Sequence, residues 1–220
     1  MDLFNNPEPV PPASQMAVLP FLAGVQGLLS AGRVDNLQLT IHRLMYREGQ
    51  EFLQQVCPYL PLGAGADGAG RVFSVNTGIM GAAYDKAQLF RTRYFEDEQA
   101  FIAARSKDAS MKEDAKRSWL AIPLLGPDEQ VVLILYATCE TLNFFSDDAR
   151  IHQIVAMAKG FCLLHDFLQE SPFTNLRNFP LLKGKPNRDG GGLHKVQETV
   201  DIELPRFKTL SSFNYEAAAA

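Results

Sequence analysis

The segment KRSWLAIPLLGPDEQVVLILYAT covers residues 116–138 and holds two apolar runs around a short polar stretch. That stretch, GPDE at 126–129, contains residue types that favour turns, so the segment predicts a β-hairpin. Residues 131–136 are all apolar, which indicates a strand covered on both faces. Pro123 cannot donate a backbone hydrogen bond and predicts a bulge or a strand end. We therefore expect this hairpin at the centre of a sheet, with the rest of the chain packed around it.

The composition is that of an ordinary globular protein. The chain has 220 residues, of which 46% are hydrophobic and 21% charged, enough for one sizeable core with tails. The net charge is −4 and no polybasic cluster occurs, which disfavours nucleic acid and a membrane surface as partners. The apolar segment at 14–31 follows no Lys or Arg and is interrupted by Pro20, Gly24 and Gly27. We therefore expect neither a signal peptide nor a membrane span. The chain is expected to be a soluble cytoplasmic protein.

Two long segments predict terminal helices. The first, at 14–31, begins at a capping Ser14 and closes at Gly32, and the second, at 147–169, begins at Ser146 or Asp147. In both helices the apolar arc is wider than one packing surface requires. If the protein were a monomer, we expect one apolar stripe to be left exposed, either the stripe opposite or the one formed by Leu22, Leu29, Ile154, Phe161 and Leu168.

Two arrangements would cover this surface. In the first, the 14–31 and 147–169 helices pair with their copies about a two-fold axis, which makes the protein a homodimer. In the second, the C-terminal tail folds back over the helices of its own chain. The tail side chains that are apolar enough for this are Phe173, Phe179, Leu181 and Leu182.

Shorter elements are predicted between the helices. A half-buried strand is expected at 36–45, where apolar residues alternate with a polar, solvent-facing side that includes Thr40 and His42. Further strands are expected at 51–59 and 71–75, a short strand or irregular segment at 89–95, and short helices within 76–83 and 96–104. The glycines of GAGADGAG at 63–70 have the GxGxxG spacing, but a strand follows them, so we reject a dinucleotide site. Gly78 and Gly81 predict a close backbone approach, either to an anion at a helix start or to the sheet.

The order of these elements resembles a GAF domain, a small-molecule sensing family related to PAS. The matching segments are LTIHR at 39–43, GIMG at 78–81, KRSWLAIPL at 116–124 and NFFSDD at 143–148, within a resemblance that covers about 16–170. It implies an α+β fold with a central antiparallel sheet of about six strands. The terminal helices would cover one face, and short helices would lie over a pocket on the other. The residues by which family members hold cyclic nucleotides or bilins are absent, so neither ligand nor cofactor is identified.

The chain is therefore expected to have three regions. Residues 1–13 form a flexible lead-in and residues 14–171 form the GAF-like domain. Residues 172–220 form an extended, largely disordered or partner-docking tail, within which 196–204 is a short extended segment. The four alanines at 217–220 are attributed to a cloning linker.

The resemblance and the side chains place a candidate ligand site under the short helices. Aromatic and apolar residues would form its walls, and arginines would meet an acidic ligand. The alternative is that the aromatic rings fill the space and no ligand binds. The candidate site residues are Phe73, Ile79, Gly81, Tyr84, Arg91, Tyr94, Phe95, Phe101, Arg117, Trp119 and Tyr136.

The cysteines and histidines show no metal-binding pattern. Cys57, Cys139 and Cys162 are far apart, no CxxC occurs, and the four histidines are not at metal-ligand spacing. We expect buried thiols in a reducing cytoplasm, with a single reactive sensor thiol as the alternative.

Together these features predict a non-enzymatic cytoplasmic sensory or regulatory domain that dimerises, with binding of a small molecule as one hypothesis. The alternative is a ligand-free structural adaptor that binds a protein partner through its dimer surface or through residues 173–216. An enzyme is least favoured because no His or Cys lies beside an obvious acid or base, which leaves the three thiols as the candidate nucleophiles. Neither nucleic acid nor membrane is expected as a partner.

Overall fold

The computed structural model describes residues 13–47, 50–62, 69–76, 78–107, 115–126, 129–170 and 196–207. Seven strands form one sheet in the order β3-β2-β1-β6-β5-β4-β7, and all neighbouring strands are antiparallel. The elements are α1 (Ala13–Ser30), β1 (Gln38–Arg47), β2 (Gln50–Gln55), β3 (Val72–Ser74), α2 (Gly78–Lys86), β4 (Leu89–Thr92), α3 (Glu98–Arg105), β5 (Ser118–Leu125), β6 (Val131–Cys139), the 3-10 turn η1 (Phe144–Ser146), α4 (Asp148–Glu170) and β7 (Gln197–Val200).

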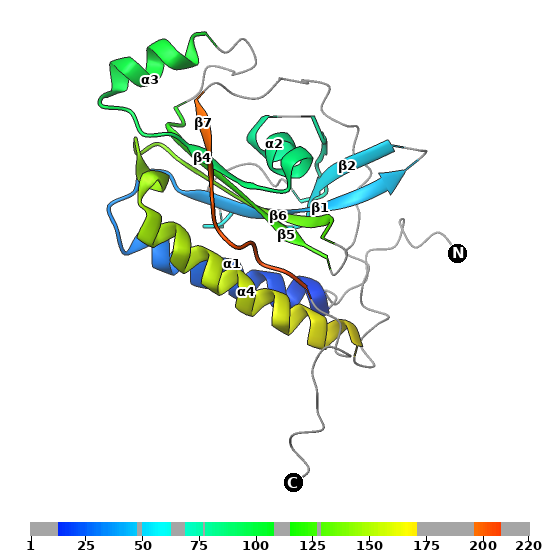
Figure 1. The fold of residues 1–220 in the computed structure, drawn as a ribbon. Helices are drawn as coiled ribbons and strands as arrows, with labels where there is room; N and C mark the ends of the chain where they lie inside the picture. The colour runs from blue at the N-terminus through cyan, green and yellow to red at the C-terminus, as the bar shows by residue number, and fades with distance from the viewer. Residues whose placement is uncertain are drawn as a thin grey trace.

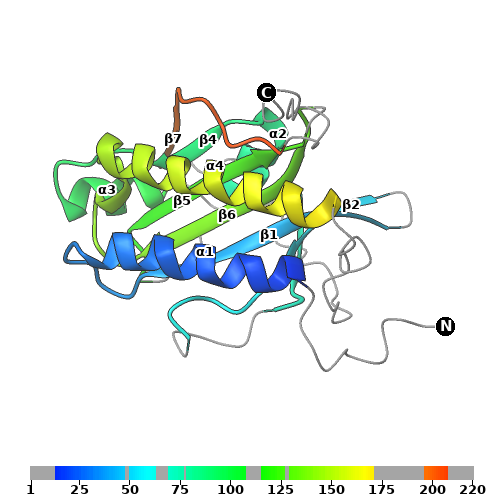
Figure 2. The same cartoon turned by 90° about the horizontal axis from the view of Figure 1, so that it is seen from below.

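The elements are arranged in layers. Helices α1 and α4 lie side by side on one face of the sheet, as Figure 1 and Figure 2 show, and α2 lies on the opposite face. Helix α3 projects beyond one end of the sheet (Figure 1). The predicted α+β fold class is confirmed, including an antiparallel sheet with both terminal helices on one face. Among the described residues, no helix has the length and apolar character needed to cross a membrane.

The predicted hairpin forms the middle of the sheet. All residues of β5 are buried, and β5 pairs with β6 along its whole length, with a bulge between Leu124 and Leu125. Pro123 lies inside β5 instead of at its end. On the side of β5 away from β6, strand β4 pairs with Leu120 and Ala121 and the chain near Pro205 meets Leu125, so on that side Pro123 lies between the two pairings and faces no strand. A proline is tolerated there because no ladder hydrogen bond is lost.

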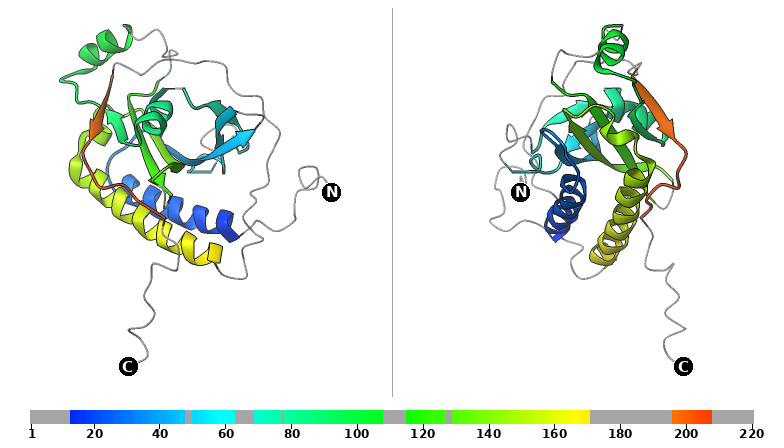
Figure 3. Two further views of the ribbon diagram at one scale, coloured as in Figure 1. Left: turned by 45° about the vertical axis from the view of Figure 1, so that its right-hand side comes forward. Right: turned by 90° about the vertical axis from the view of Figure 1, so that its left-hand side faces the viewer.

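The sheet has seven strands instead of about six, because residues expected in the tail add β7 to the β4 edge. We call residues 196–207 the closing segment. After β7 it runs along the sheet edge toward α4 (Figure 3). The amide of Leu125 donates to the carbonyl of Pro205 at 2.9 Å, and the amide of Phe207 donates to the carbonyl of Leu125 at 2.8 Å. Two ion pairs also hold the closing segment to the rest of the domain: Arg91 with Glu198 at 2.8 Å, and Lys159 with Glu203 at 2.6 Å.

The apolar stripes of α1 and α4 are buried within one chain. Leu22, Leu29, Ile154 and Phe161 are each at most 3% exposed, and so are Val18, Val25, Ile151 and Val155 on the opposite stripe. The expectation that a monomer would leave one of the stripes exposed is therefore wrong. The side chain of Leu168 lies outside the described residues.

Two contacts explain this burial. Helices α1 and α4 pack against each other, with the rings of Phe21 and Phe161 stacked 4.6 Å apart. The closing segment covers the same core with Ile202, Leu204 and Phe207. A fold-back of the C-terminal region therefore occurs, although with other residues than Phe173, Phe179, Leu181 and Leu182, which lie outside the described residues. Dimerisation remains a prediction, but the argument from exposed apolar stripes no longer supports it, because these stripes are buried.

All three thiols are free and buried, as expected. Burial raises the pKa of Cys139 to about 12 and also raises the pKa of Cys57. At pH 8 both groups stay protonated, and the thiolate is the reactive form. We therefore predict that iodoacetamide modifies the native protein far more slowly than the urea-unfolded chain, as intact-mass measurement would show. Rapid native labelling of one thiol would instead favour the sensor alternative.

Candidate functional site

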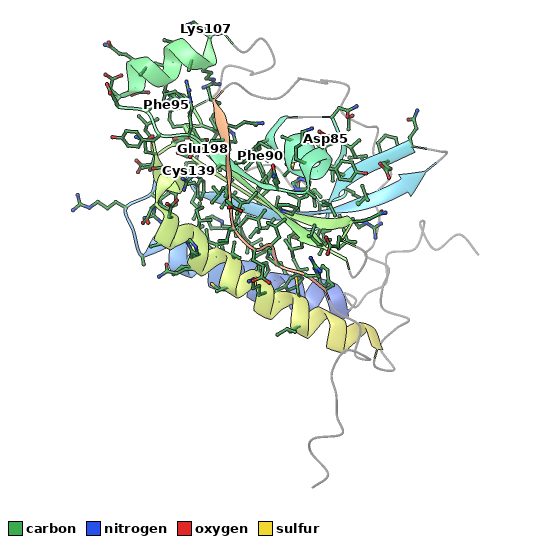
Figure 4. The ribbon with its side chains drawn as sticks, viewed as in Figure 1. Asp85, Phe90, Phe95, Lys107, Cys139 and Glu198 are labelled. Carbon is green, nitrogen blue, oxygen red and sulfur yellow. The ribbon has the colours of Figure 1, made fainter. Side chains whose placement is uncertain are left out.

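The candidate residues were expected on the sheet face that α2 covers, here called the α2 face. In Figure 4, Phe95 marks the side of this face nearest α3, and Asp85 marks α2 itself. Most of the predicted aromatic and apolar residues meet in one core cluster there. The members are Phe73, Ile79, Phe95, Phe101 and Trp119, with Tyr84 and Tyr136 packed against them.

At the α3 end of this cluster, the rings pack closely against each other. Phe101 is fully buried, with its ring 5.4 Å from that of Phe95 and 6.0 Å from that of Trp119. The guanidinium of Arg117 lies 5.7 Å from the centre of the Phe101 ring, and its Nε is 2.8 Å from a carboxylate oxygen of Glu98. This end of the α2 face is therefore filled by its own side chains.

Two candidates do not lie on this face. Arg91 points to the opposite side of β4, because successive residues of a strand alternate and Phe90 belongs to the α2-face cluster. Its guanidinium donates to the carbonyls of Phe145 and Ser146 and pairs with Asp148 and Glu198, so it fastens the start of α4 and β7 to β4. The side chain of Tyr94 is 64% exposed. Neither residue can line a site under α2.

Gly81 and Tyr84 position α2. A Cβ atom on Gly81 would lie 2.6 Å from the carbonyl oxygen of Val75, so only glycine lets the helix approach this strand end so closely. The close approach at Gly81 is therefore to protein backbone. The hydroxyl of Tyr84 donates to Glu51 of β2, and burial together with this carboxylate raises the pKa of Tyr84 to about 12.

A row of buried polar side chains lies on the α2 face, which the sequence analysis did not identify. It consists of Thr40, His42, Gln55 and Thr138, each at most 4% exposed. The alternation of LTIHR predicted a strand with one solvent-facing side, but the structure buries both sides of β1 at these positions. In the sequence, the polar side of that alternation was the only feature that pointed to this row. A polar side looks the same in the sequence whether it faces water or a covered site.

His42 is the most enclosed of these groups. Its ring lies 5.3 Å from that of Phe73 and 5.9 Å from that of Tyr136, edge-on to both, and neither ring nitrogen has a hydrogen-bond partner. Burial, with a smaller contribution from the charge of Arg71, lowers the pKa of His42 to about 3. The imidazole is therefore neutral at pH 7, with one N–H donor and one acceptor nitrogen.

Gln55 lies directly opposite His42 in the β1–β2 register. Its side-chain amide donates to the carbonyl of Cys57 at 2.8 Å, but its Oε1 is buried without a partner. A buried polar group without a partner costs about 1–3 kcal/mol, and most such groups in proteins are paired. The pair of His42 and Gln55 thus holds unused hydrogen-bonding capacity at one place.

On the opposite face, β1 and β6 are apolar at the matching positions, whereas β2 carries the buried Gln54, whose amide is bonded at both ends. Residues that alternate with Thr40, His42 and Thr138 belong to the apolar core under α1 and α4: Leu39, Ile41, Leu135, Ala137 and Cys139. The two faces therefore differ in chemistry although they share strands. Within the described ranges, no group of three or more His, Cys, Asp or Glu side chains is placed to hold a metal ion.

Asn143 fastens the loop that carries Phe95. Its side-chain amide donates to the carbonyl of Phe95 at 2.6 Å, and its Oδ1 accepts from the amide of Phe95 at 2.9 Å. We predict that Asn143→Ala lowers the free energy of unfolding by about 1–3 kcal/mol, because both backbone groups lose a partner. Urea titration measures this loss. Asn36 also has a positive φ and a side chain bonded at an exposed site, so Asn36→Ala controls for backbone strain. Equal losses in both variants would contradict the prediction.

Comparisons with known proteins give little further information. No family model matches the chain, and a search of curated proteins found no match. Among solved structures, the fold is similar to the crystal structure of an IclR transcriptional regulator from Alicyclobacillus acidocaldarius. The two chains are 12% identical, with a TM-score of 0.38, and the likeness covers 75% of this chain and 68% of that one. A likeness of this degree does not assign the chain to a family.

Proposed function

We propose that the chain is a non-enzymatic regulatory domain that binds a small molecule on the α2 face of its sheet. The observation that carries this proposal is a pair of buried side chains that lie opposite each other, in which both ring nitrogens of His42 and the Oε1 of Gln55 have no hydrogen-bond partner. A core that served only stability would gain from apolar residues at these positions, such as β1 and β6 have on their opposite face. A ligand would supply the missing partners.

Binding fits the surroundings of His42 better than catalysis does. A general base needs a titratable proton near neutral pH and a partner that orients it. His42 is flanked by the rings of Phe73 and Tyr136, and its pKa of about 3 keeps it neutral. Such an imidazole can orient a bound molecule by hydrogen bonds without exchanging protons with it.

Dimerisation through α1 and α4 is retained as part of the proposal. Its support is now limited to Leu19 on α1 and Leu163 on α4, which are 38% and 44% exposed. Sedimentation of the full chain at micromolar concentration tests dimerisation. A monomer at that concentration would contradict it. A ligand-free adaptor remains the alternative if no small molecule is found.

Native mass spectrometry of the protein purified from its own host tests the proposed function. We expect a species heavier than the bare chain by the mass of a small molecule, which denaturation releases. The same spectrum gives the oligomeric state independently. Only bare-chain masses, in preparations from several growth conditions, would overturn ligand binding and leave the adaptor.

A further inference from the structure

His42 of β1 and Gln55 of β2 are directly paired across the two strands, and together they form a small recognition site. Directly opposed residues of an antiparallel pair have Cβ atoms about 4.5–5.5 Å apart, so both side chains can reach one bound group. Gln55 Oε1 can only accept a hydrogen bond, so the partner must bring a donor to it. The neutral imidazole carries one N–H donor, which the same partner can meet with an acceptor.

We propose that the ligand of the α2 face is an uncharged planar molecule with an N–H donor beside a carbonyl acceptor, as in a primary amide or a cyclic lactam, held between Gln55 Oε1 and the ring of His42. This inference rests on the proposed function and specifies its ligand class. The N–H group would donate to Gln55, and the carbonyl would accept from the His42 N–H.

The surroundings favour an uncharged ligand. Leu44, Leu53 and Ile134 share this cluster with the two rings beside His42. An ion that left water for such surroundings would lose its hydration without a charged partner, which is far costlier than transferring an amide. The charge of Arg71 reaches His42, but Arg71 is exposed to water and its guanidinium lies over the Phe73 ring, 5.1 Å from its centre, so it is not a buried partner for an ion.

The aromatic rings favour a planar ligand. Phe73 and Tyr136 flank the imidazole and stand nearly perpendicular to it, at 76° and 81°, and a flat group is the shape that packs best among aromatic rings. The ring nitrogens of His42 are closed to solvent, so a ligand enters when a ring moves aside. Phe73 is the ring better placed to move, since β3 has three residues and pairs with one neighbour only.

The first measurement is the stability of ligand-free His42→Phe and Gln55→Leu. Both substitutions remove unpaired polar atoms, and the carbonyl of Cys57 keeps its bond from the Thr40 hydroxyl at 2.9 Å. We expect unfolding midpoints equal to or above that of the wild type. Gln54→Leu is the matched control, because Gln54 is equally buried on β2 but both ends of its amide are bonded, and we expect its midpoint to fall. A fall in all three variants would overturn the inference.

The second measurement is binding, by calorimetry on the full chain stripped of bound molecules. The probes are nicotinamide and uracil, which are neutral, and nicotinate, which replaces the amide of nicotinamide by a carboxylate. We expect at least one neutral probe to bind more tightly than nicotinate, and His42→Phe and Gln55→Leu to weaken it about tenfold or more, the effect of one lost hydrogen bond in such a site. Gln54→Leu should bind as the wild type does.

The outcomes separate this inference from the proposed function. Preference for nicotinate, absence of binding by both neutral probes, or unchanged binding in both variants would overturn the ligand class. If native mass spectrometry nevertheless detects a bound acid, the proposed function stands and the inference falls. If it detects no ligand in any preparation, both fall.

Discussion

A chain that ends at Glu170 is expected to aggregate. This truncation removes the closing segment and with it strand β7 and the side chains of Ile202, Leu204 and Phe207, which pack against the core under α1 and α4. Each large apolar side chain contributes about 1.5–3 kcal/mol when fully buried. Phe207 is buried and Ile202 and Leu204 are half-buried, so together they contribute a substantial part of the stability of a typical domain, about 5–15 kcal/mol. Their loss also exposes the ring of Phe161, which packs edge-on against Phe207 with centres 6.3 Å apart.

Size-exclusion chromatography and binding of a hydrophobic dye measure this outcome. A chain that ends at Phe207 is the matched control, because it keeps the closing segment, and it should elute as the full chain does. If the chain ending at Glu170 stays folded, soluble and dimeric, the closing segment is dispensable and pairing of the terminal helices gains the support that it lacks at present.

Trp119→Ala is expected to lower the free energy of unfolding by about 3–5 kcal/mol. The side chain is 9% exposed in the middle of the sheet, and its ring stacks with that of Phe101, which is fully buried and fills the space next to it. Removing the indole leaves a cavity that backbone movement in a central strand cannot close.

Urea unfolding followed by circular dichroism measures the loss, since Trp119 is the only tryptophan and its fluorescence disappears with it. Tyr94→Ala is the control: its side chain is 64% exposed and should change stability by less than about 0.5 kcal/mol. A loss below about 1 kcal/mol for Trp119→Ala would show that the α2-face cluster is loosely packed. In the wild type, the same fluorophore should respond to a ligand bound on this face.

The elements that were predictable from the sequence are those whose pattern is local. The hairpin of β5 and β6 was marked by two apolar runs and a turn, and α1 and α4 by broad apolar arcs. Asp147 caps α4 as predicted and accepts from the amides of Ala149 and Arg150, but α1 already includes Ala13, so Ser14 is not its cap. Strand β2 ends earlier than expected, at Gln55 instead of 59, because Pro58 cannot continue the ladder. Beyond it, the chain still pairs with β1 through Leu39 and Leu60.

The features that were not predictable depend on contacts between distant residues. Glu198 lies 107 positions from Arg91, and the polar sequence around it has the composition of a tail, so nothing local marked it as the seventh strand. The same long-range pairing explains why the apolar stripes of α1 and α4 are covered within one chain.

The candidate site was predicted in part for a similar reason. Alternation along a strand shows which residues share a face, but the local sequence does not show which face lies under α2. Arg91 was therefore placed on the wrong side of β4, and His42 was assigned to a solvent-facing side although it is fully buried. Aromatic residues such as Phe95 and Phe101 were found correctly because their size alone predicts burial.

Hydrogen–deuterium exchange tests most directly whether a ligand occupies the α2 face. The protein isolated from its own host would be compared with the same protein after unfolding, dialysis and refolding, which removes bound small molecules. The account predicts that the ligand slows exchange in peptides from β1, β2 and β3, around His42, Gln55 and Phe73, and leaves α1 and α4 unchanged. Identical exchange in the two samples, or protection confined to α1, α4 or the closing segment, would contradict it.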